Sequence, residues 1–226
     1  LHAAHAQRKF GFRRALGDEN ALIGDEAVNT VAVLTRHHLH ARQVIAALQA
    51  GKHVFCEKPL ALNAAELDEV AAALQEAQAQ AQNQAQGRTP LLTVGFNRRF
   101  APLAQRLAAF LSTRKEPLAA VYRVNAGFIP DKHWVHDPLQ GGGRLVGEGC
   151  HFVDFLTFLC AAPPVQVQAF ALDDPQHLQD TLTVSMRFEN GAIGSIAYLA
   201  NGGRGLPKES VEVHCNGMSA VLADFR

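Results

Sequence analysis

Residues 29–59 read NTVAVLTRHHLHARQVIAALQAGKHVFCEKP, and this stretch decides the fold of the first half of the chain. Asn29–Leu34 and His53–Cys56 are short apolar runs with β-branched or aromatic residues, which predicts two buried strands. Between them, His40–Ala50 carries apolar residues at helical spacing, and Gly51 stands where a glycine commonly ends a helix. A strand, a helix and a strand with connections this short predict parallel strands and a crossover helix.

The pattern continues for one more unit toward the C-terminus. Asn63 predicts the start of a long helix, because Glu66 stands three positions later, as in a capping box. The apolar residues predicted to share one face of this helix are Leu67, Val70, Ala71 and Leu74. Leu91–Val94 is the third predicted strand, and Pro102 opens a further helix. We therefore predict an α/β fold with a Rossmann-type, doubly wound parallel sheet, since the units are too few to close a barrel.

The second half of the chain has a different pattern, with short strands that follow one another. The predicted strands are Val121–Phe128, Val165–Leu172, Thr181–Phe188, Ile193–Leu199 and Val211–Cys215. Apolar and polar residues alternate over 181–188, which predicts a sheet with one packed face. A helix over Gly149–Cys160 interrupts the strands. We predict an α+β domain with a mostly antiparallel open sheet, and we place the two domains at 1–116 and 117–226.

The composition limits the classes of partner. The 226 residues include 21 Lys and Arg against 21 Asp and Glu, a formal net charge of zero. Nucleic acids and anionic membranes attract a basic excess, so neither is a predicted partner. No apolar run approaches the roughly 18–20 residues of a membrane span. The four cysteines, which lack C-x-x-C spacing, predict reduced thiols in a cytoplasmic protein.

Polar residues follow each of the three predicted parallel strands. The three clusters are Thr35–His38, Glu57–Pro59 and Asn97–Arg99. Because ligands bind at the carboxyl ends of parallel strands, we expect all three clusters at one edge of the sheet. Lys58 has two interpretations: a surface lysine paired with Glu57, or a lysine aimed into the crevice as a proton donor or carbonyl polariser.

Other polar residues admit more than one role. His37, His38 and His40 are neighbours without a cysteine or carboxylate at zinc spacing, so no metal site is predicted. Arg98 and Arg99 either hold phosphates or cap a strand end.

The run from Gly141 to Gly149 contains five glycines, yet it lacks the G-x-G-x-x-G spacing of a phosphate loop. It leads instead into the predicted helix that carries His151 and Asp154. His151 is either a structural histidine or a group for proton transfer near neutral pH.

Three segments together resemble the Gfo/Idh/MocA family of oxidoreductases: Thr35–Ala41, Ala50–Leu60 with its A-G-K-H-V-x-x-E-K-P signature, and Gly142–Asp154. Segments Gly95–Phe100 and Leu206–Glu209 resemble a branch of it that is fused behind a zinc-type alcohol dehydrogenase-like domain. The resemblance implies a Rossmann domain that binds NAD or NADP, and a second domain whose open sheet serves in homo-oligomerisation. It also implies hydride transfer to or from a hydroxyl carbon of a sugar, a cyclitol or a related polyol.

The resemblance also implies roles for individual residues. Lys58 would hydrogen-bond the reacting oxygen, and His151 would act as the acid and base. The residues implied to bind the cofactor are Thr35, Arg36, His37, Glu57, Lys58 and Arg99. Those implied to meet the substrate are Lys58, Glu148 and His151.

Two departures from the family pattern leave alternatives open. Many members carry an Asp four residues before the catalytic histidine, where this chain has Gly147, so either Glu148 substitutes for it or the proton relay differs. The chain also opens at Leu1 without the family's Gly-rich loop, so we expect a piece of a longer oxidoreductase that lacks about 30 residues. The alternatives are an NAD-assisted hydrolase or lyase of the same fold, and a non-catalytic oligomerising subunit.

Overall fold

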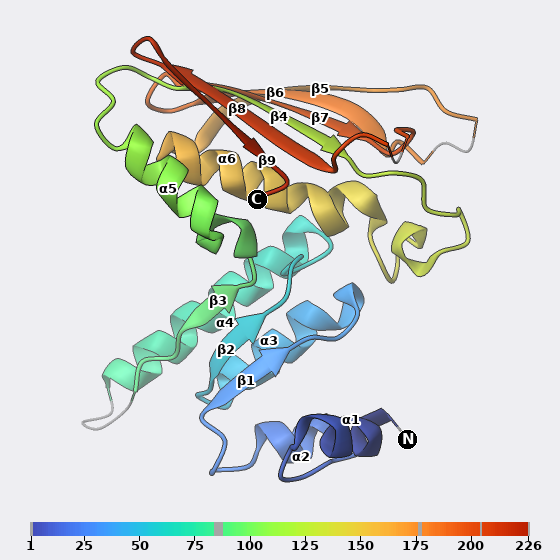
Figure 1. The fold of residues 1–226 in the computed structure, drawn as a ribbon. Helices are drawn as coiled ribbons and strands as arrows, with labels where there is room; N and C mark the ends of the chain where they lie inside the picture. The colour runs from blue at the N-terminus through green and yellow to red at the C-terminus, as the bar shows by residue number, and fades with distance from the viewer. Residues whose placement is uncertain (1, 84–87, 176–177, 204, 226) are drawn as a thin grey trace. The chain divides into compact units, whose positions relative to one another are not determined.

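The computed structural model describes residues 2–83, 88–175, 178–203 and 205–225 (Figure 1). It forms two compact units, Leu1–Gly95 and Phe96–Arg226. The units divide before the domain boundary predicted between residues 116 and 117, because helix α5 (Pro102–Leu111) packs in the core of the second unit. The domain boundary itself stays a prediction.

The first unit contains a three-stranded sheet with its strands in chain order, β1-β2-β3. Its elements are α1 (His2–Phe10), α2 (Glu19–Ile23), β1 (Thr30–Val33), a 3₁₀ turn η1 (His37–Leu39), α3 (His40–Gln49), β2 (His53–Cys56), α4 (Ala64–Gln82) and β3 (Leu92–Val94). Both pairings are parallel, with Val31 opposite Val54 and Val54 opposite Leu92. The predicted parallel α/β architecture is confirmed.

Helices α3 and α4 cover one face of this sheet (Figure 1). The core between them is made of small and branched side chains: Val31, Val33, Ala41, Val44, Ala47, Leu48, Val54, Cys56, Ala61, Val70, Ala73 and Ala77. Gly51 follows α3 with a φ of 70°, the left-handed conformation expected of a glycine after a helix. Asn63 caps α4, because its side-chain oxygen accepts from the Glu66 backbone N–H at 2.9 Å.

The predicted apolar face of α4 was right for Val70, which is buried, and for Leu74, which packs against the core, but wrong for Leu67 and Ala71. Leu67 is 46% exposed, and the buried residues of the helix are Val70, Ala73, Ala77 and Ala81. A stripe of alanines lets the helix approach its neighbours closely, so this stripe faces the core together with Val70, and the bulkier Leu67 stays outside. The helix therefore keeps one buried face through its alanine-rich end.

The second unit contains a six-stranded sheet in the order β5-β6-β7-β4-β8-β9. Its elements are a 3₁₀ turn η2 (Asn97–Phe100), α5, β4 (Ala119–Asn125), a 3₁₀ turn η3 (Trp134–His136), a π-helical turn η4 (Leu145–Gly149), α6 (Cys150–Cys160), β5 (Pro164–Ala171), β6 (Thr181–Phe188), β7 (Ile193–Leu199), β8 (Glu209–Cys215) and β9 (Met218–Ala223). β4 and β7 pair in parallel, and the other four pairings are antiparallel. The mostly antiparallel sheet is confirmed.

Sequence reasoning missed the last strand, β9. It pairs with β8 through a tight hairpin at Asn216 and Gly217, whose φ values are 50° and 70°. An Asn-Gly pair is the strongest short-range signal of such a turn, so the sequence did contain the evidence for β9.

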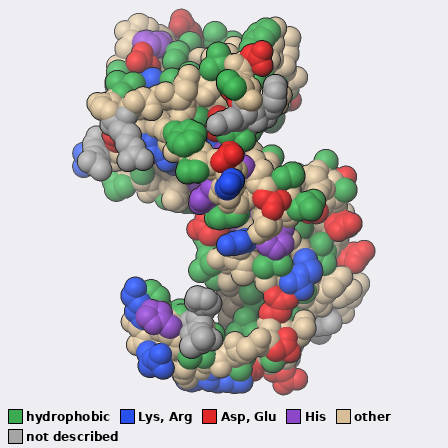
Figure 2. All heavy atoms as spheres, turned by 90° about the vertical axis from the view of Figure 1, so that its right-hand side faces the viewer, with side chains coloured by type: hydrophobic (Ala, Val, Ile, Leu, Met, Phe, Trp, Pro, Cys, Tyr) green, Lys and Arg blue, Asp and Glu red, His purple; other side chains and the backbone are tan. Residues whose placement is uncertain are grey.

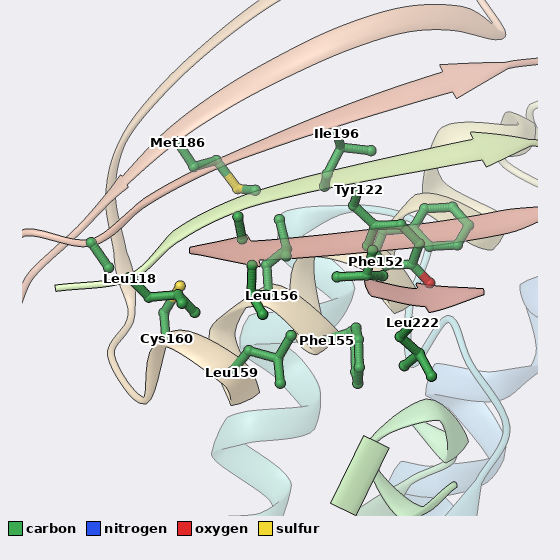
Figure 3. Packing of buried hydrophobic residues seen from close by; sticks show 14 of the residues in the cluster. Leu118, Tyr122, Phe152, Phe155, Leu156, Leu159, Cys160, Met186, Ile196 and Leu222 are labelled. Carbon is green, nitrogen blue, oxygen red and sulfur yellow. The ribbon is translucent and has the colours of Figure 1, made fainter. Parts of the chain in front are cut away.

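Helices α5 and α6 lie on the same face of this sheet (Figure 1). As predicted, Phe152, Phe155, Leu156 and Leu159 of α6 are buried. Figure 3 shows them packed with Tyr122, Met186 and Ile196 of the sheet and with Leu222 of β9. Full burial of side chains this large contributes about 1.5–3 kcal/mol each, so α6 is anchored firmly in its unit.

Acidic, basic and hydrophobic side chains are interspersed on the face drawn in Figure 2, in agreement with the balanced charge of the chain. Among the described residues, none of the helices has the length and apolarity that crossing a membrane requires.

Candidate functional site

Two of the three predicted polar clusters lie at the carboxyl edge of the first sheet. β1 ends at Val33 shortly before Thr35–His37, and β2 ends at Cys56 directly before Glu57 and Lys58. Because the two strands are adjacent and parallel, both clusters leave the sheet at the same edge. Lys58 is half-buried and precedes Pro59 through a cis peptide bond, while the side chains of Thr35 and Arg36 are exposed.

The Glu57 side chain lies close to the backbone of Gly95, the residue that follows β3. The backbone N–H of Glu57 donates to the Val33 carbonyl at 2.9 Å, which joins it to β1. A Cβ at Gly95 would lie 3.2 Å from the carboxylate carbon of Glu57 and from the ring of Phe55. The glycine therefore leaves the space that the Glu57 side chain occupies.

The loop after β1 is tied to helix α3 by side chains that the sequence analysis did not assign. Thr35 donates its hydroxyl hydrogen to the Gln43 amide oxygen at 2.7 Å, and Gln43 in turn donates to Glu19 at 2.5 Å. His40 is 1% exposed, and its ring nitrogens lie 3.0 Å from the Thr35 carbonyl and 2.7 Å from the Pro59 carbonyl. The sequence analysis considered His40 only as a metal ligand. Its place as a polar residue on the buried face of an amphipathic helix could have indicated this structural role.

The third predicted cluster belongs to the second unit, where both arginines bind carboxylates. Arg98 donates from Nε and Nη2 to both carboxylate oxygens of Glu209, at 2.8 and 2.7 Å. Tyr122 also hydrogen-bonds Glu209, and the Arg98 guanidinium stacks over the Phe152 ring with a 4.9 Å centroid distance. Arg99 makes a bidentate pair with Asp154 of α6, with one contact of 3.0 Å. Both arginines therefore tie η2 to the elements around α6.

His151 lies in the first turn of α6 and is 5% exposed. The ring of Phe96 meets its imidazole edge to face, with the centroids 6.0 Å apart. Immediately before it, the chain makes the π-helical turn Leu145–Gly149, in which Gly147 and Gly149 are buried. A π-helical turn at the start of a helix is often associated with functional sites.

Glu148, which was predicted to meet the substrate, is the centre of a charged cluster in the second unit. Its carboxylate accepts from the Tyr198 hydroxyl at 2.6 Å and from Lys208 Nζ at 2.9 Å, and Arg144 lies 3.6 Å away. Arg144 is fully buried and also faces Asp180 at 3.5 Å. Burial opposes ionisation of Glu148, but the bonds from Tyr198 and Lys208 and the charge of Arg144 lower its pKa to about 2. Glu148 is therefore ionised at neutral pH and fixes the turn before His151.

The described residues contain no group of three or more His, Cys, Asp or Glu side chains arranged to hold a metal ion. Of the histidines weighed for that role, His40 is engaged with the two carbonyls described above.

Comparison with known proteins places this geometry in a family. Residues 2–85 match the family described as "Oxidoreductase family, NAD-binding Rossmann fold", and residues 116–221 match "GFO/IDH/MocA C-terminal domain". The chain belongs to the Gfo/Idh/MocA oxidoreductase family. The resemblance inferred from the sequence is thereby confirmed.

Similar members of the Gfo/Idh/MocA family carry the names of sugar and cyclitol dehydrogenases. Levoglucosan dehydrogenase of Pseudarthrobacter phenanthrenivorans is 25% identical, with 88% of this chain and 56% of that protein covered. Myo-inositol 2-dehydrogenase of Thermotoga maritima is 29% identical, with 84% and 55% covered. A solved levoglucosan dehydrogenase in complex with NADH and levoglucosan superposes with a TM-score of 0.81 at 25% identity, covering 98% of this chain and 61% of that one. The chain thus spans just over half the length of the curated relatives it matches.

Proposed function

We propose that the full-length protein transfers a hydride between NAD or NADP and a hydroxyl-bearing carbon of a sugar, a cyclitol or a related polyol. The observation that carries the proposal is the shared carboxyl edge of β1 and β2, from which Thr35–His37 and Glu57–Lys58 extend. Such an edge is where open parallel sheets bind nucleotides. Family membership and the names of the relatives give the reaction class and the substrate class.

The residues present at this edge fit a nicotinamide dinucleotide. Arg36 brings an exposed cation, and the Thr35 hydroxyl oxygen can accept a hydrogen bond while its hydrogen is given to Gln43. We propose that Thr35, Arg36 and His37 hold the nicotinamide side of the cofactor, with Glu57 and Lys58 beside them. When bound, the nicotinamide supplies a two-electron hydride acceptor or donor.

Oxidation of an alcohol needs a base and a stabilising cation in addition to the hydride acceptor. As hydride leaves the carbon, the hydroxyl proton must leave the oxygen, and the C=O bond forms. We propose that the Lys58 ammonium donates a hydrogen bond to the reacting oxygen as negative charge develops there, and that His151 serves as the acid and base of the reaction. In the reverse direction, His151 returns the proton.

Arg99 was predicted to touch the cofactor, and Glu148 was predicted to touch the substrate. Their ion pairs support a different role for both residues. Arg99 is engaged with Asp154 three residues beyond His151, and Glu148 is engaged with Tyr198 and Lys208 three residues before it. We propose that both act by holding α6 and the turn before it, so that the imidazole of His151 keeps one orientation.

The outer face of the six-stranded sheet supports a proposal about the oligomeric state of the full-length protein. Exposed apolar side chains lie on the outer face of the six-stranded sheet, among them Val121, Phe170, Ile193 and Val221. We propose that this face joins copies of the protein into a homo-oligomer, which light scattering of the full-length protein would test. Cytoplasmic location is also proposed, since Cys56, Cys150, Cys160 and Cys215 are free thiols, the state that reducing compartments maintain.

The test uses the full-length protein and begins with fluorescence titrations of NADH and NADPH. Turnover is then measured against a panel of sugars and cyclitols for the wild type, Lys58→Ala and His151→Asn. We expect turnover to fall by about 100-fold or more in each variant, because each removes a group that acts in the transition state. Lys9→Ala and His5→Asn, which change exposed residues of α1, are the matched controls and should keep wild-type turnover.

Other outcomes would contradict the proposal. If neither nucleotide binds, a non-catalytic subunit becomes the better account. If a nucleotide stays bound while substrate is cleaved without net reduction, the protein is an NAD-assisted hydrolase or lyase. Wild-type turnover in Lys58→Ala would remove Lys58 from the mechanism.

A further inference from the structure

A buried histidine in the first unit bridges the two loops that carry the predicted cofactor-edge residues. His40 is the first residue of α3, and its side chain is almost fully enclosed. Nδ1 lies 2.7 Å from the Pro59 carbonyl oxygen, and Nε2 lies 3.0 Å from the Thr35 carbonyl oxygen. One imidazole therefore contacts the loop after β1 and the turn after β2 at the same time.

Both partners are backbone carbonyls, which only accept hydrogen bonds. A neutral imidazole donates to one of them according to its tautomer, and an imidazolium donates to both. Each carbonyl lies at or next to a residue with a proposed role. One belongs to Thr35 itself, and the other belongs to Pro59, the residue after Lys58. The ring of His37 packs against His40 as well, with the centroids 5.8 Å apart.

We infer that His40 is a positioning residue that sets the placement of Lys58 through Pro59 and of the cofactor loop through Thr35. The inference rests on the proposed function, in which Lys58 meets the reacting oxygen and Thr35–His37 hold the nicotinamide side. His40 touches neither substrate nor cofactor in this account. Its two ring nitrogens have separable effects, one on turnover and one on cofactor affinity.

Other contacts anchor the two loops to different degrees, and this difference separates the two effects. The loop after β1 has a second tie to α3, because the Thr35 hydroxyl binds Gln43. Loss of the Nε2 contact should therefore loosen the loop without releasing it. Glu57 is tied to β1 through its backbone N–H, whereas Pro59 lacks an N–H, so the carbonyl held by His40 is an important anchor beyond Lys58.

Two amide substitutions test the two nitrogens one at a time in the full-length protein. His40→Asn places its amide nitrogen near the position of Nδ1, which keeps the Pro59 contact and loses the Thr35 contact. His40→Gln places it near Nε2, which keeps the Thr35 contact and loses the Pro59 contact. The measurements are kcat with the best polyol of the panel, and the Kd of the nicotinamide cofactor by fluorescence titration.

We expect His40→Gln to lower kcat by about 10- to 100-fold with a cofactor Kd within twofold of the wild type, because small displacements of a catalytic group are costly. We expect His40→Asn to raise the cofactor Kd by about fivefold, the effect of losing one hydrogen-bonding contact, with kcat within threefold. Hydrogen exchange should rise at residues 57–62 in the Gln variant and at 34–38 in the Asn variant. His53→Asn, at the other end of β2, is the matched control and should change none of these values.

Two results would overturn the inference. The first is wild-type kcat and Kd in both variants. The second is an equal loss of kcat and affinity in both, with hydrogen exchange raised throughout the first unit, which is the behaviour of a residue that only stabilises the fold. Lys58→Ala, measured in parallel, separates failure of this inference from failure of the proposed function. If only the role of His40 is wrong, Lys58→Ala still abolishes turnover. If the proposed function is wrong, Lys58→Ala leaves turnover intact.

Discussion

The two units hold their functional residues by different forces. In the first unit, the loop beyond β1 and the turn beyond β2 are anchored by hydrogen bonds to uncharged groups: the Thr35 hydroxyl donates to the Gln43 amide oxygen, and the His40 ring lies against the Thr35 and Pro59 carbonyls. In the second unit, the helix of His151 lies within ion pairs: Arg98 with Glu209, Arg99 with Asp154, and Lys208 with Glu148. A hydrogen bond between neutral groups tolerates changes of pH and salt, whereas a framework of charges depends on their ionisation. The difference predicts that acid and charge-removing substitutions act mainly on the second unit.

The largest effect is expected from Glu209→Ala. The change leaves the Arg98 guanidinium, whose side chain is 13% exposed, and the buried Tyr122 hydroxyl without their shared acceptor, and breaking a largely buried ion pair in this way costs about 3–5 kcal/mol. Hydrogen exchange should rise in β4 and β8 and stay unchanged in β1–β3. Glu212→Ala, an exposed residue of the same strand, is the control. An equal effect of the two substitutions would show that the buried pair does not support the unit.

A smaller steric effect is expected from Gly141→Ala. A Cβ there would lie 2.4 Å from the Val135 carbonyl oxygen, which is backbone and cannot turn away. We expect a loss of about 1–3 kcal/mol, as for other overpacked sites, measured by urea denaturation. Gly203→Ala, with nothing within 4 Å of its Cβ, is the control. An undiminished stability would mean that residues 133–137 can move away from the glycine run.

The pH dependence of the second unit should originate in part at Glu148. Its pKa in the folded chain, about 2, lies below the ordinary value of 4.5. A lowered carboxyl pKa stabilises the fold above pH 4.5, and that contribution is lost as the pH falls from 4.5 to about 2. The stability of Glu148→Gln should therefore vary less steeply over this range than that of the wild type. Parallel pH curves for the two proteins would exclude Glu148 as the source.

The smallest effect is expected from Gln43→Leu in the first unit. The substitution removes the acceptor of the Thr35 hydroxyl, a neutral hydrogen bond worth about 1 kcal/mol, and also the donor to Glu19, a carboxylate that stays paired with Arg42. The loss should be similar at pH 5 and pH 8, in contrast to the effects in the second unit. A loss that changes strongly with pH would remove the distinction between the two units.

The sequence predicted the elements of the fold more completely than the site. Apolar runs, alternation and flanking turn residues placed β2, β6 and β7 at their observed bounds, because these features depend on neighbours in the chain. The buried face of α4 was predicted only in part, since Ala73, Ala77 and Ala81 were missed, because their burial depends on how closely the next helix packs. The partners of Arg98, Arg99 and Glu148 could not be predicted, since they come from residues about 50 to 110 positions away in the chain.

The same difference between local and long-range contacts explains which site residues could be predicted from the sequence. Thr35, Glu57 and Lys58 follow strands directly, so the parallel sheet alone brings them to one edge. The bridging position of His40 depends on a contact between residues 40 and 59, which no local pattern specifies.

Hydride transfer itself is the most direct test of the central claim. The full-length protein would be incubated with NAD or NADP and a polyol that carries deuterium at the carbon to be oxidised, and the cofactor and the product would be analysed by mass spectrometry. We predict net formation of reduced cofactor that carries the deuterium, together with a ketone or aldehyde product, and neither in Lys58→Ala. Deuterium that remains in the product while the cofactor returns to its oxidised form would contradict the assignment as a dehydrogenase.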